Sequence, residues 1–345
     1  MAIQAEIKPA SGFGRRRFLA GAAGALALTA PAFAAPARRY TIAFANLTEE
    51  LGARIEGLGF SGIEVRRSFE FAARTLPVDM VYFDNGGEPG RALTNAQAIL
   101  KLKPDLFIQY NADLEANAEI GGKMQAAGIP VLALNYPVPG APFYGADNFG
   151  AGRLAGVTLG QFAKRDWREE TSVAAVAGDL GDLGPAVSAR ARGIAEGLAQ
   201  ELPGLKPATL DTSGSPLRIE AMLKKLFASL SREKLLLATL DDATALAARA
   251  ALELMARNND CVICSQGLDR SIHGGANDKK EIDPANRASP VIGSVAYFVD
   301  RYGYDVLPLA LKMLAGETLP ARTLTKHVLV SAQNIFAIYP PYDMN

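Results

Sequence analysis

The chain has little of what enzymes use for general-base catalysis or metal binding. It contains two histidines, His273 and His327, and two cysteines among 345 residues. Transition-metal sites are built mainly from these residue types, so no metal site is expected. No nucleophile–base pair and no dinucleotide fingerprint is visible, and two imidazoles leave little general-base capacity. The sequence therefore predicts a protein that is not an enzyme and that carries no cofactor.

The chain also lacks an excess of charge and a long apolar run. Lysine plus arginine and aspartate plus glutamate number 36 each, which gives a formal net charge of zero. Nucleic acids and anionic membranes attract proteins through an excess of positive charge. No stretch reaches the ~20 apolar residues that a membrane span needs. We therefore expect neither a nucleic-acid partner nor a transmembrane helix.

The two cysteines, Cys261 and Cys264, form a C-x-x-C pair that can signal a redox or metal site. They lie in the apolar run 261–265, which is typical of a buried strand. Three residues along a strand place the two side chains on opposite faces, with Cα atoms roughly 10 Å apart, too far for a disulfide. The spacing predicts two free, buried thiols.

The first residues have the pattern of an export signal. The motif R-R-x-F-L occupies residues 15–19, a mildly apolar stretch follows at 20–30, and small residues stand at Ala32 and Ala34. This order is that of a twin-arginine signal peptide over residues 1–34; a disordered basic tail is the alternative. We expect a soluble protein exported to the periplasm by the twin-arginine pathway.

From Tyr40 onward, short apolar runs alternate with segments of helical spacing. This alternation predicts an α/β fold with parallel sheets and right-handed crossovers. The expected strands lie at 40–45, 78–83, 105–109, 129–134, 172–177, 208–210, 235–240, 260–265 and 291–297, and the expected helices include 188–201 and 243–258.

The length predicts two domains, because single hydrophobic cores stop growing near ~250–300 residues. A late helix at 303–315 and a strand around 323–330 have no domain of their own to fill, so we expect at least one of them to return to the first sheet. The prediction is two similar lobes, each a parallel sheet flanked by helices, joined by a multi-strand hinge. The N-terminal lobe would comprise residues 40–136 plus about 298–326, and the C-terminal lobe 137–297 plus about 327–345.

The stretch 129–156 has the features of a passage between the two lobes. A buried strand ends at Leu134, and Asn135 and Tyr136 follow it. Three prolines then favour extended backbone, and Asp147 stands where a short polar side chain can cap a helix. Ligands of open α/β sheets bind beyond the carboxyl ends of strands, so Asn135, Tyr136 and Asp147 are candidate ligand contacts.

Five short motifs occur in the order seen in one known family. They are Gly145–Asn148 with Ala151-Gly152, Ser188–Gly193, Leu240–Ala245, Ser294–Tyr297 with Tyr302-Gly303, and Gly316–Pro320. With them the mature chain resembles the periplasmic sugar-binding proteins of ABC transporters. These proteins have the type I periplasmic-binding fold, as in the ribose-, galactose- and xylose-binding proteins.

The resemblance implies a monomer that binds a small molecule between its lobes and docks on an ABC transporter permease in the inner membrane. It also implies that Arg190 reaches the ligand. The chain departs from the family pattern in three places. Residues 46–56 intervene before Phe60, where the family has a paired aromatic, Gln266 stands where a strand usually ends in aspartate, and Asn135-Tyr136 replaces Asp-Arg. These departures are consistent with an unusual ligand.

Polyols are held by planar polar side chains that pair with hydroxyls and by aromatic faces that stack on the ring. The candidate ligand-binding residues are of these kinds and most follow predicted strands. They are Asn46, Phe60, Gln109, Tyr110, Asn135, Tyr136, Asp147, Arg190, Asp241, Gln266 and Tyr297.

Three of these assignments have alternatives. Arg190 could be a solvated helix charge, but a cation in the first turn opposes the helix dipole, which favours a binding role. Of Asp241 and Asp242, one is expected to cap the helix that follows; we assign the ligand to Asp241 and the cap to Asp242, and the reverse stays open. The tyrosines could equally be core residues with a hydrogen-bonded hydroxyl.

The sequence thus favours a periplasmic substrate-binding protein of an ABC importer for a monosaccharide, polyol or related small hydroxylated ligand. A non-sugar ligand such as a nucleoside or signalling molecule is the main alternative, and an exported enzyme is a further one. A transcriptional repressor of the same fold would need a basic helix-turn-helix before Tyr40, which is absent.

Overall fold

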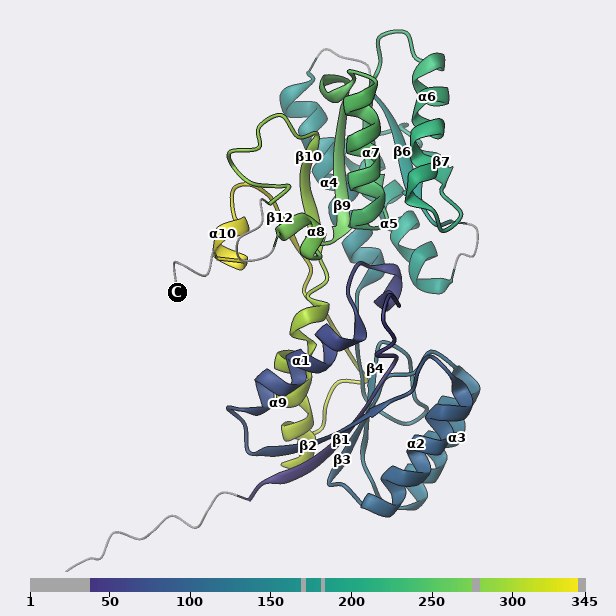
Figure 1. The fold of residues 1–345 in the computed structure, drawn as a ribbon, viewed down its shortest axis with the longest axis vertical. Coiled ribbons are helices and arrows are strands. Elements are labelled where there is room, and N and C mark those ends of the chain that lie inside the picture. The colour runs from purple at the N-terminus through teal and green to yellow at the C-terminus, as the bar shows by residue number, and fades with distance from the viewer. Residues whose placement is uncertain (1–37, 169–171, 181–183, 275–279, 341–345) are drawn as a thin grey trace, which may run out of the picture. The chain divides into compact units, whose positions relative to one another are not determined.

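The computed structural model describes residues 38–168, 172–180, 184–274 and 280–340, so the predicted signal segment 1–34 lies outside the described residues. The described residues belong to one compact unit that begins at Arg38. In these ranges the unit contains two sheets of six strands each (Figure 1). We call each sheet with its flanking helices a lobe, and number the lobes in chain order.

The sheet of the first lobe is entirely parallel. Its spatial order is β11-β5-β4-β3-β1-β2, with strands β1 (Tyr40–Asn46), β2 (Val78–Asp84), β3 (Leu106–Gln109), β4 (Val131–Leu134), β5 (Phe143–Gly145) and β11 (Arg322–Leu324). The helices α1 (Gly62–Ala73) and α9 (Tyr302–Leu314) lie side by side on one face, and α2 (Pro89–Leu102) and α3 (Leu114–Ala126) lie on the other (Figure 1).

Strand β1 shows why this sheet is apolar on both faces. Ile42 and Phe44 pack into the core beneath α1 and α9, whereas Ala43 and Ala45 pack beneath α2 and α3. Alternate residues of a strand point to opposite faces, so a strand covered by helices on both sides must be apolar throughout.

The second lobe repeats this architecture with one reversed edge strand. Its order is β12-β10-β9-β8-β6-β7, with strands β6 (Ser172–Gly178), β7 (Ala208–Asp211), β8 (Lys234–Thr239), β9 (Cys261–Gly267), β10 (Val291–Ala296) and the antiparallel β12 (Val328–Val330). Helices α4 (Asn148–Asp166) and α5 (Pro185–Glu201) pack on one another; α6 (Ile219–Ser229) and α7 (Asp242–Leu254) form a second pair. The predicted class of two α/β lobes is confirmed.

The described residues also form six short helical segments. They are the α-helices α8 (Arg270–His273) and α10 (Ile335–Ile338), and the 3₁₀ turns η1 (Ile55–Gly57), η2 (Pro216–Arg218), η3 (Asn258–Asp260) and η4 (Val299–Arg301).

Close packing of α4 on α5 fixes the position of Arg190. A methyl group at Gly152 would lie 2.0 Å from the carbonyl oxygen of Arg190, and one at Gly193 would lie 2.1 Å from that of Phe149. Real Cβ atoms do not approach backbone so closely, so only glycine allows this separation of the two helices. The contact holds Arg190 beside the first turn of α4.

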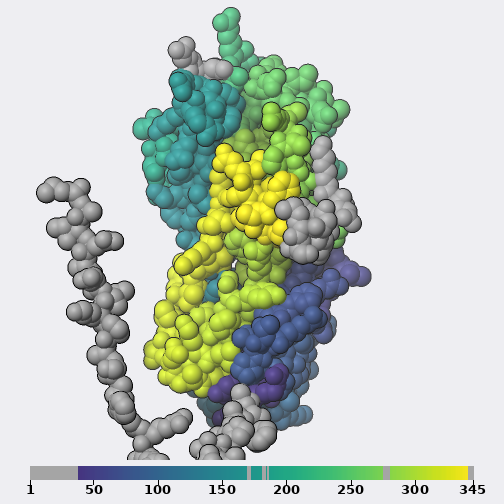
Figure 2. All heavy atoms as spheres, turned by 90° about the vertical axis from the view of Figure 1, so that its left-hand side faces the viewer, coloured from purple at the N-terminus to yellow at the C-terminus, as the bar shows by residue number. Residues whose placement is uncertain are grey.

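Within the described residues the chain passes between the lobes three times: from β5 to α4, from β10 to α9 and from β11 to β12. The single strand expected around 323–330 is two strands, one in each sheet, so the predicted return to the first sheet is confirmed. Figure 2 shows the chain after about residue 300, in yellow-green and yellow, lying over both lobes.

Strand β5 pairs with β4 and β11 in the first sheet. Residues 137–145, which were predicted to belong to the C-terminal lobe, therefore include a strand of the first lobe. The prolines of this stretch hold the chain extended, as expected, but the extended chain returns to the sheet that it has just left. We keep the division into lobes as a proposal, with the first passage after Gly145 rather than after Tyr136.

The cysteines lie as predicted. Cys261 and Cys264 are both free and buried, and they pack into different hydrophobic clusters on the two faces of the second sheet. Burial raises the pKa of Cys264 to about 12 and raises the pKa of Cys261 well above its usual value. Both thiols therefore act as small apolar groups.

Candidate functional site

Polar side chains from both lobes converge where strands β3 and β4 end. Tyr110 follows β3, Asn135 follows β4, and Arg190 of the second lobe reaches toward the same place. All three were predicted to be ligand contacts. They meet at a residue that was not predicted, Glu56: Tyr110 and Asn135 donate to its carboxylate, and Arg190 donates to its main-chain carbonyl oxygen.

The Glu56 carboxylate accepts hydrogen bonds from three of the predicted site residues. Tyr110 Oη donates to Oε1 at 2.7 Å, Asn135 Nδ2 donates to Oε1 at 3.3 Å, and Tyr136 Oη donates to Oε2 at 3.3 Å. Burial raises the pKa of Glu56, while these hydrogen bonds and the charge of Arg190 lower it; the net shift is upward. The site therefore surrounds an acidic group with donors while partly shielding it from water.

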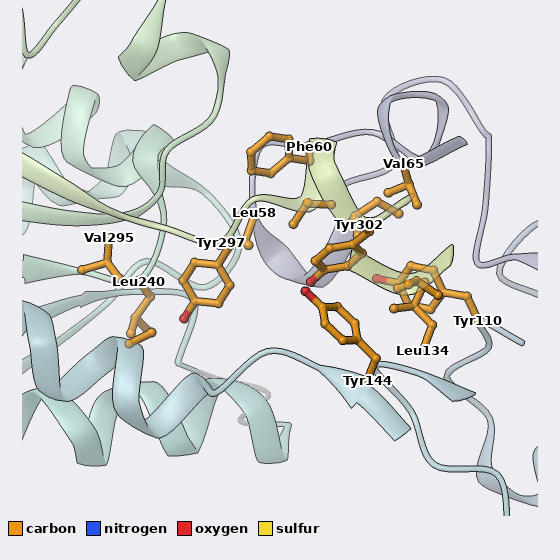
Figure 3. Close-up of a cluster of buried hydrophobic side chains, with 14 of the residues drawn as sticks. Leu58, Phe60, Val65, Tyr110, Leu134, Tyr144, Leu240, Val295, Tyr297 and Tyr302 are labelled. Atoms are coloured by element: carbon orange, nitrogen blue, oxygen red, sulfur yellow. The ribbon is translucent and has the colours of Figure 1, made fainter. Parts of the chain in front are cut away.

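Glu56 is carried by a tight segment of the insertion that follows β1, residues Arg54–Phe60, which we call the 54–60 loop. Ile55 and Leu58 are fully buried and Phe60 is 1% exposed, so three apolar side chains anchor it. Figure 3 shows two of them, Leu58 and Phe60. The backbone closes on itself where the Ile55 nitrogen donates to the Phe60 carbonyl oxygen at 2.8 Å.

The loop also holds an unusual backbone conformation. Glu56 has φ 57° and the next residue, Gly57, has φ 68°. The left-handed region suits glycine but is unfavourable for glutamate, at a cost of about 1–3 kcal/mol. Such strain persists only where surrounding contacts stabilise it, and here the contacts of the carboxylate and the apolar anchors do so.

The 54–60 loop contacts the second lobe as well as the first. Arg190 Nη2 donates to the carbonyl oxygen of Glu56 at 2.8 Å. A methyl group at Gly59 would lie 1.5 Å from Asp269 Oδ2, and one at Gly267 would lie 3.6 Å from Leu58 Cδ2. One segment therefore bridges the lobes at the site.

Arg190 is buried, with 1% of its surface exposed. Its Nε donates to Asn148 Oδ1 at 2.7 Å, its Nη1 donates to the Leu240 carbonyl oxygen at 3.2 Å, and its guanidinium lies 5.1 Å from the ring centre of Tyr297. A buried guanidinium with three hydrogen bonds is a positioned group and not a solvated helix charge.

The predicted place of Arg190 in the first turn of its helix is wrong. Helix α5 begins at Pro185, three residues earlier than predicted, because proline suits the first helical position. Arg190 thus lies in the second turn, where the helix dipole is weak.

Tyr297 and Gln266 form a second polar pair beside Arg190. Tyr297 Oη donates to Gln266 Oε1 at 2.9 Å and lies 3.4 Å from Asn148 Oδ1. Among the residues that the structure describes, Gln266 Nε2 is buried with no hydrogen-bond partner. The Gln266 amide nitrogen is therefore available to donate to a ligand.

The structure gives the capping role predicted for Asp242 to Asp241. Helix α7 begins at Asp242, one residue earlier than predicted, so Asp241 is the residue that caps it, with Oδ1 accepting from the Thr244 nitrogen at 2.8 Å. Asp242 does not cap; it is buried and accepts from Ser265 Oγ at 2.6 Å and Ser294 Oγ at 2.8 Å. Burial raises the pKa of both carboxyls.

Four further predicted residues have structural contacts of their own. Asn46 Nδ2 donates to the Gly62 carbonyl oxygen at 2.8 Å, and Gln109 Nε2 lies 3.3 Å from Asn117 Oδ1 on α3. Asp147 caps α4, as its sequence context predicted, through the Gly150 nitrogen at 2.9 Å. Phe60 is an anchor of the 54–60 loop. None of these contacts is to Arg190 or to the Glu56 carboxylate.

Sequence reasoning missed three residues of the site. Glu56 lies in the insertion that was noted only as a departure from the family pattern. Asn148 was quoted beside Asp147 but not chosen. Tyr302, the first residue of α9, was quoted in a motif; its Oη accepts from Asn135 Nδ2 at 3.3 Å, and its ring packs edge-on against Tyr144 at 5.6 Å (Figure 3).

Metal ligands are not gathered anywhere in the described ranges. These ranges contain no group of three or more histidine, cysteine, aspartate or glutamate side chains placed to hold a metal ion. No helix among them is both long enough and apolar enough to cross a membrane.

Comparison with known proteins gives a consistent result. The family model described as periplasmic binding protein domain matches residues 61–318. No curated protein matches the chain.

Many solved structures share the fold. One is an ABC transporter periplasmic solute binding protein from Actinobacillus succinogenes with bound D-allose, at 15% identity and TM-score 0.64, covering 87% of this chain and 100% of that one. Another is an ABC transporter solute binding protein from Bacillus halodurans with bound myo-inositol, at 17% identity and TM-score 0.61, covering 89% and 99%. A third, from Mycobacterium smegmatis, is in complex with β-D-fucofuranose, at 19% identity and TM-score 0.64, covering 88% and 95%.

Proposed function

The chain belongs to the family of periplasmic binding proteins, and on that premise we propose that it is the substrate-binding protein of an ABC importer. Its ligand would be a monosaccharide, a polyol or a related small hydroxylated molecule held between the two lobes. The family is one of binding proteins that act outside the cytoplasm, and not of enzymes.

The observation that carries the proposal is the convergence of donors from both lobes on one point. The first lobe supplies Tyr110 and Asn135 at the ends of neighbouring strands, and the second supplies Arg190. A ligand shifts an equilibrium between open and closed lobes only through contacts that are better in the closed state. Groups on each lobe that meet at one ligand provide that difference.

The chemistry of the site suits hydroxylated rings. Tyr110, Tyr136 and Tyr297 offer aromatic faces, and Asn135 and Gln266 offer planar amides that can pair with neighbouring hydroxyls. The ligands of the solved structures with this fold, D-allose, myo-inositol and β-D-fucofuranose, support the same class. A nucleoside or signalling molecule is the alternative ligand class.

The proposal includes the predicted partners and the export route. We infer that the loaded protein docks as a monomer on an inner-membrane permease after export by the twin-arginine pathway. Changing Arg15 and Arg16 together to lysine should leave precursor in the cytoplasm, measured by immunoblotting of cell fractions. Undiminished mature protein in the periplasm would contradict this route.

A thermal-shift screen of sugars, polyols and nucleosides tests the function. A ligand at ~100 Kd stabilises the folded protein by about 2.7 kcal/mol, which gives a visible shift. The shift should disappear in Arg190→Ala and persist in Arg192→Ala, because Arg192 is an exposed residue of the same helix. A shift with nucleosides alone would favour the alternative class, and equal shifts in all three proteins would place the ligand elsewhere.

A further inference from the structure

Four of the groups that meet between the lobes act as hydrogen-bond donors to Glu56. Tyr110 Oη, Tyr136 Oη and Asn135 Nδ2 donate to the carboxylate of Glu56, and the Arg190 guanidinium donates to its carbonyl oxygen. A hydroxyl of a neutral sugar both donates and accepts, so a site for it alone needs acceptors as well. Several donors beside a fixed cation are instead the complement of a carboxylate.

The 54–60 loop occupies the place where these donors converge. Its anchors Ile55, Leu58 and Phe60 are buried in one hydrophobic cluster with Tyr297 of the second lobe and Tyr110 and Tyr302 of the first (Figure 3). The hydroxyl of Tyr110 and the amide of Asn135 are already paired with Glu56. A ligand that uses these donors must displace the Glu56 side chain.

The two ends of the loop are held by contacts that do not involve Glu56. Asn46 Nδ2 before the loop donates to the Gly62 carbonyl oxygen after it at 2.8 Å, and Glu49 forms an ion pair with Arg66 Nη1 of α1 at 3.1 Å. Between these contacts, Glu56 holds its left-handed backbone at a cost in free energy. Displacement would relieve that strain, and the relief would partly offset the breaking of the hydrogen bonds to Glu56.

We propose that the 54–60 loop is an internal plug of the ligand site, in which Glu56 holds the place of a carboxylate, and that the ligand that displaces it is a sugar acid or another polyhydroxy acid. This inference rests on the proposed function and narrows it. Tyr110, Tyr136, Asn135 and Arg190 then bind the ligand carboxylate, and Gln266 with Tyr297 contacts its hydroxyls.

The Glu56 carboxylate and the ligand carboxylate compete for the same donors, and this competition lowers the affinity of the ligand. The apparent affinity of a ligand is reduced by the fraction of molecules whose site is open. If the plug is in place in about 90% of molecules, removing its carboxylate should tighten binding about ten-fold. The gain should be specific to acids, since only they use the donors that Glu56 releases.

Isothermal titration calorimetry can test this with two sets of probes: D-glucuronate, D-galacturonate and D-gluconate, and the neutral D-glucose, D-galactose and D-glucitol. The proteins are the wild type, Glu56→Ala and the matched control Glu50→Ala, whose side chain is exposed in the same insertion. We expect at least one acid to bind more tightly than its neutral counterpart, and about ten-fold more tightly to Glu56→Ala than to the wild type or Glu50→Ala. Glu56→Gln, which keeps the shape of the side chain, should give a smaller gain in the same direction.

Two results would overturn the inference while leaving the proposed function intact. Weaker binding to Glu56→Ala would show that Glu56 contacts the ligand and does not compete with it. Binding of the neutral probes that is lost in Arg190→Ala, with no binding of the acids, would show that the ligand of this site does not carry a carboxylate. Failure of every acid and every neutral probe to bind the wild type and Glu56→Ala would count against this inference and the proposed function together.

Discussion

At the scale of single residues, the site depends on one carboxylate in an unfavourable environment. Glu56 is surrounded by Tyr110, Tyr136 and Tyr302, with Arg190 nearby. Burial raises the pKa of the Tyr110 and Tyr302 hydroxyls well above their usual range, and that of Tyr136 is raised too, so all three stay neutral and able to donate near pH 7. Glu56 is therefore the group in this cluster whose protonation changes in the acid to neutral range.

The raised pKa of Glu56 predicts how stability varies with pH. A carboxyl whose pKa is higher in the folded chain binds its proton more tightly there, so its contribution is fully present below the unfolded value of about 4.3 and is lost as pH rises through the folded value. The Tm of the wild type should therefore fall relative to that of Glu56→Gln as the pH rises above about 4.3. Parallel Tm curves for the two proteins, or a wild-type Tm that rises relative to that of Glu56→Gln, would contradict the direction of the shift.

The sequence predicted best those site residues that directly follow buried strands. Tyr110, Asn135 and Tyr136 were chosen because they follow buried strands, and Arg190 because of a motif; the structure brings these four together. Glu56 could not be found this way, because its position depends on an insertion whose path is set by tertiary contacts of Ile55, Leu58 and Phe60. Local patterns do not encode where such a loop packs.

At the scale of elements, the packing of α4 against α5 positions the site. The two helices meet through glycines, and the carbonyl oxygen of Arg190 lies where a side chain at Gly152 would be. Asn148 in the first turn of α4 accepts from Arg190 Nε. The separation of this helix pair therefore decides where the guanidinium lies.

Gly152→Ala should destabilise the protein and misplace Arg190. The added methyl group forces the helices apart, at a cost of about 1–3 kcal/mol for overpacking. A matched control is Gly122→Ala in α3, where the methyl group would meet nothing within 4 Å and should stabilise by about 0.5–1 kcal/mol. Differential scanning calorimetry checks both changes; a Tm for Gly152→Ala at or above that of the wild type would contradict this packing argument.

The pattern of elements followed from apolar periodicity, and the errors lie at their ends. Helix α5 begins at Pro185 and α7 at Asp242, each earlier than predicted, and the second error assigned the cap to Asp242 and not to Asp241. A one-residue difference at a helix start changes which side chain can accept from the free backbone amides of the first turn. Helix propensity does not determine the first residue of a helix that closely.

At the scale of the whole molecule, the two lobes are joined by three passages of chain and by the 54–60 loop. The loop links them through Glu56, whose carboxylate accepts from Tyr110 on one lobe and whose main-chain carbonyl oxygen accepts from Arg190 on the other. The carboxylate contacts help hold the strained Glu56 backbone in the conformation in which its carbonyl oxygen meets Arg190. The ligand-free wild type should therefore favour closed lobes, and loss of the carboxylate should weaken this link and favour open ones.

Small-angle X-ray scattering can measure this difference. The radius of gyration of ligand-free Glu56→Ala should exceed that of the wild type, and a bound ligand should reduce it again. Glu50→Ala should match the wild type. Identical values for all three ligand-free proteins would mean that the loop does not hold the lobes together.

The central claim is that one ligand is held by both lobes at the point where Arg190, Tyr110 and Asn135 converge. The most direct measurement is a crystal structure of the protein with the compound that gives the largest thermal shift. The account predicts ligand oxygens within hydrogen-bonding distance of Arg190 and of Tyr110 or Asn135, in the place now taken by the Glu56 carboxylate. A ligand bound elsewhere, with Glu56 still paired to Tyr110, would contradict it.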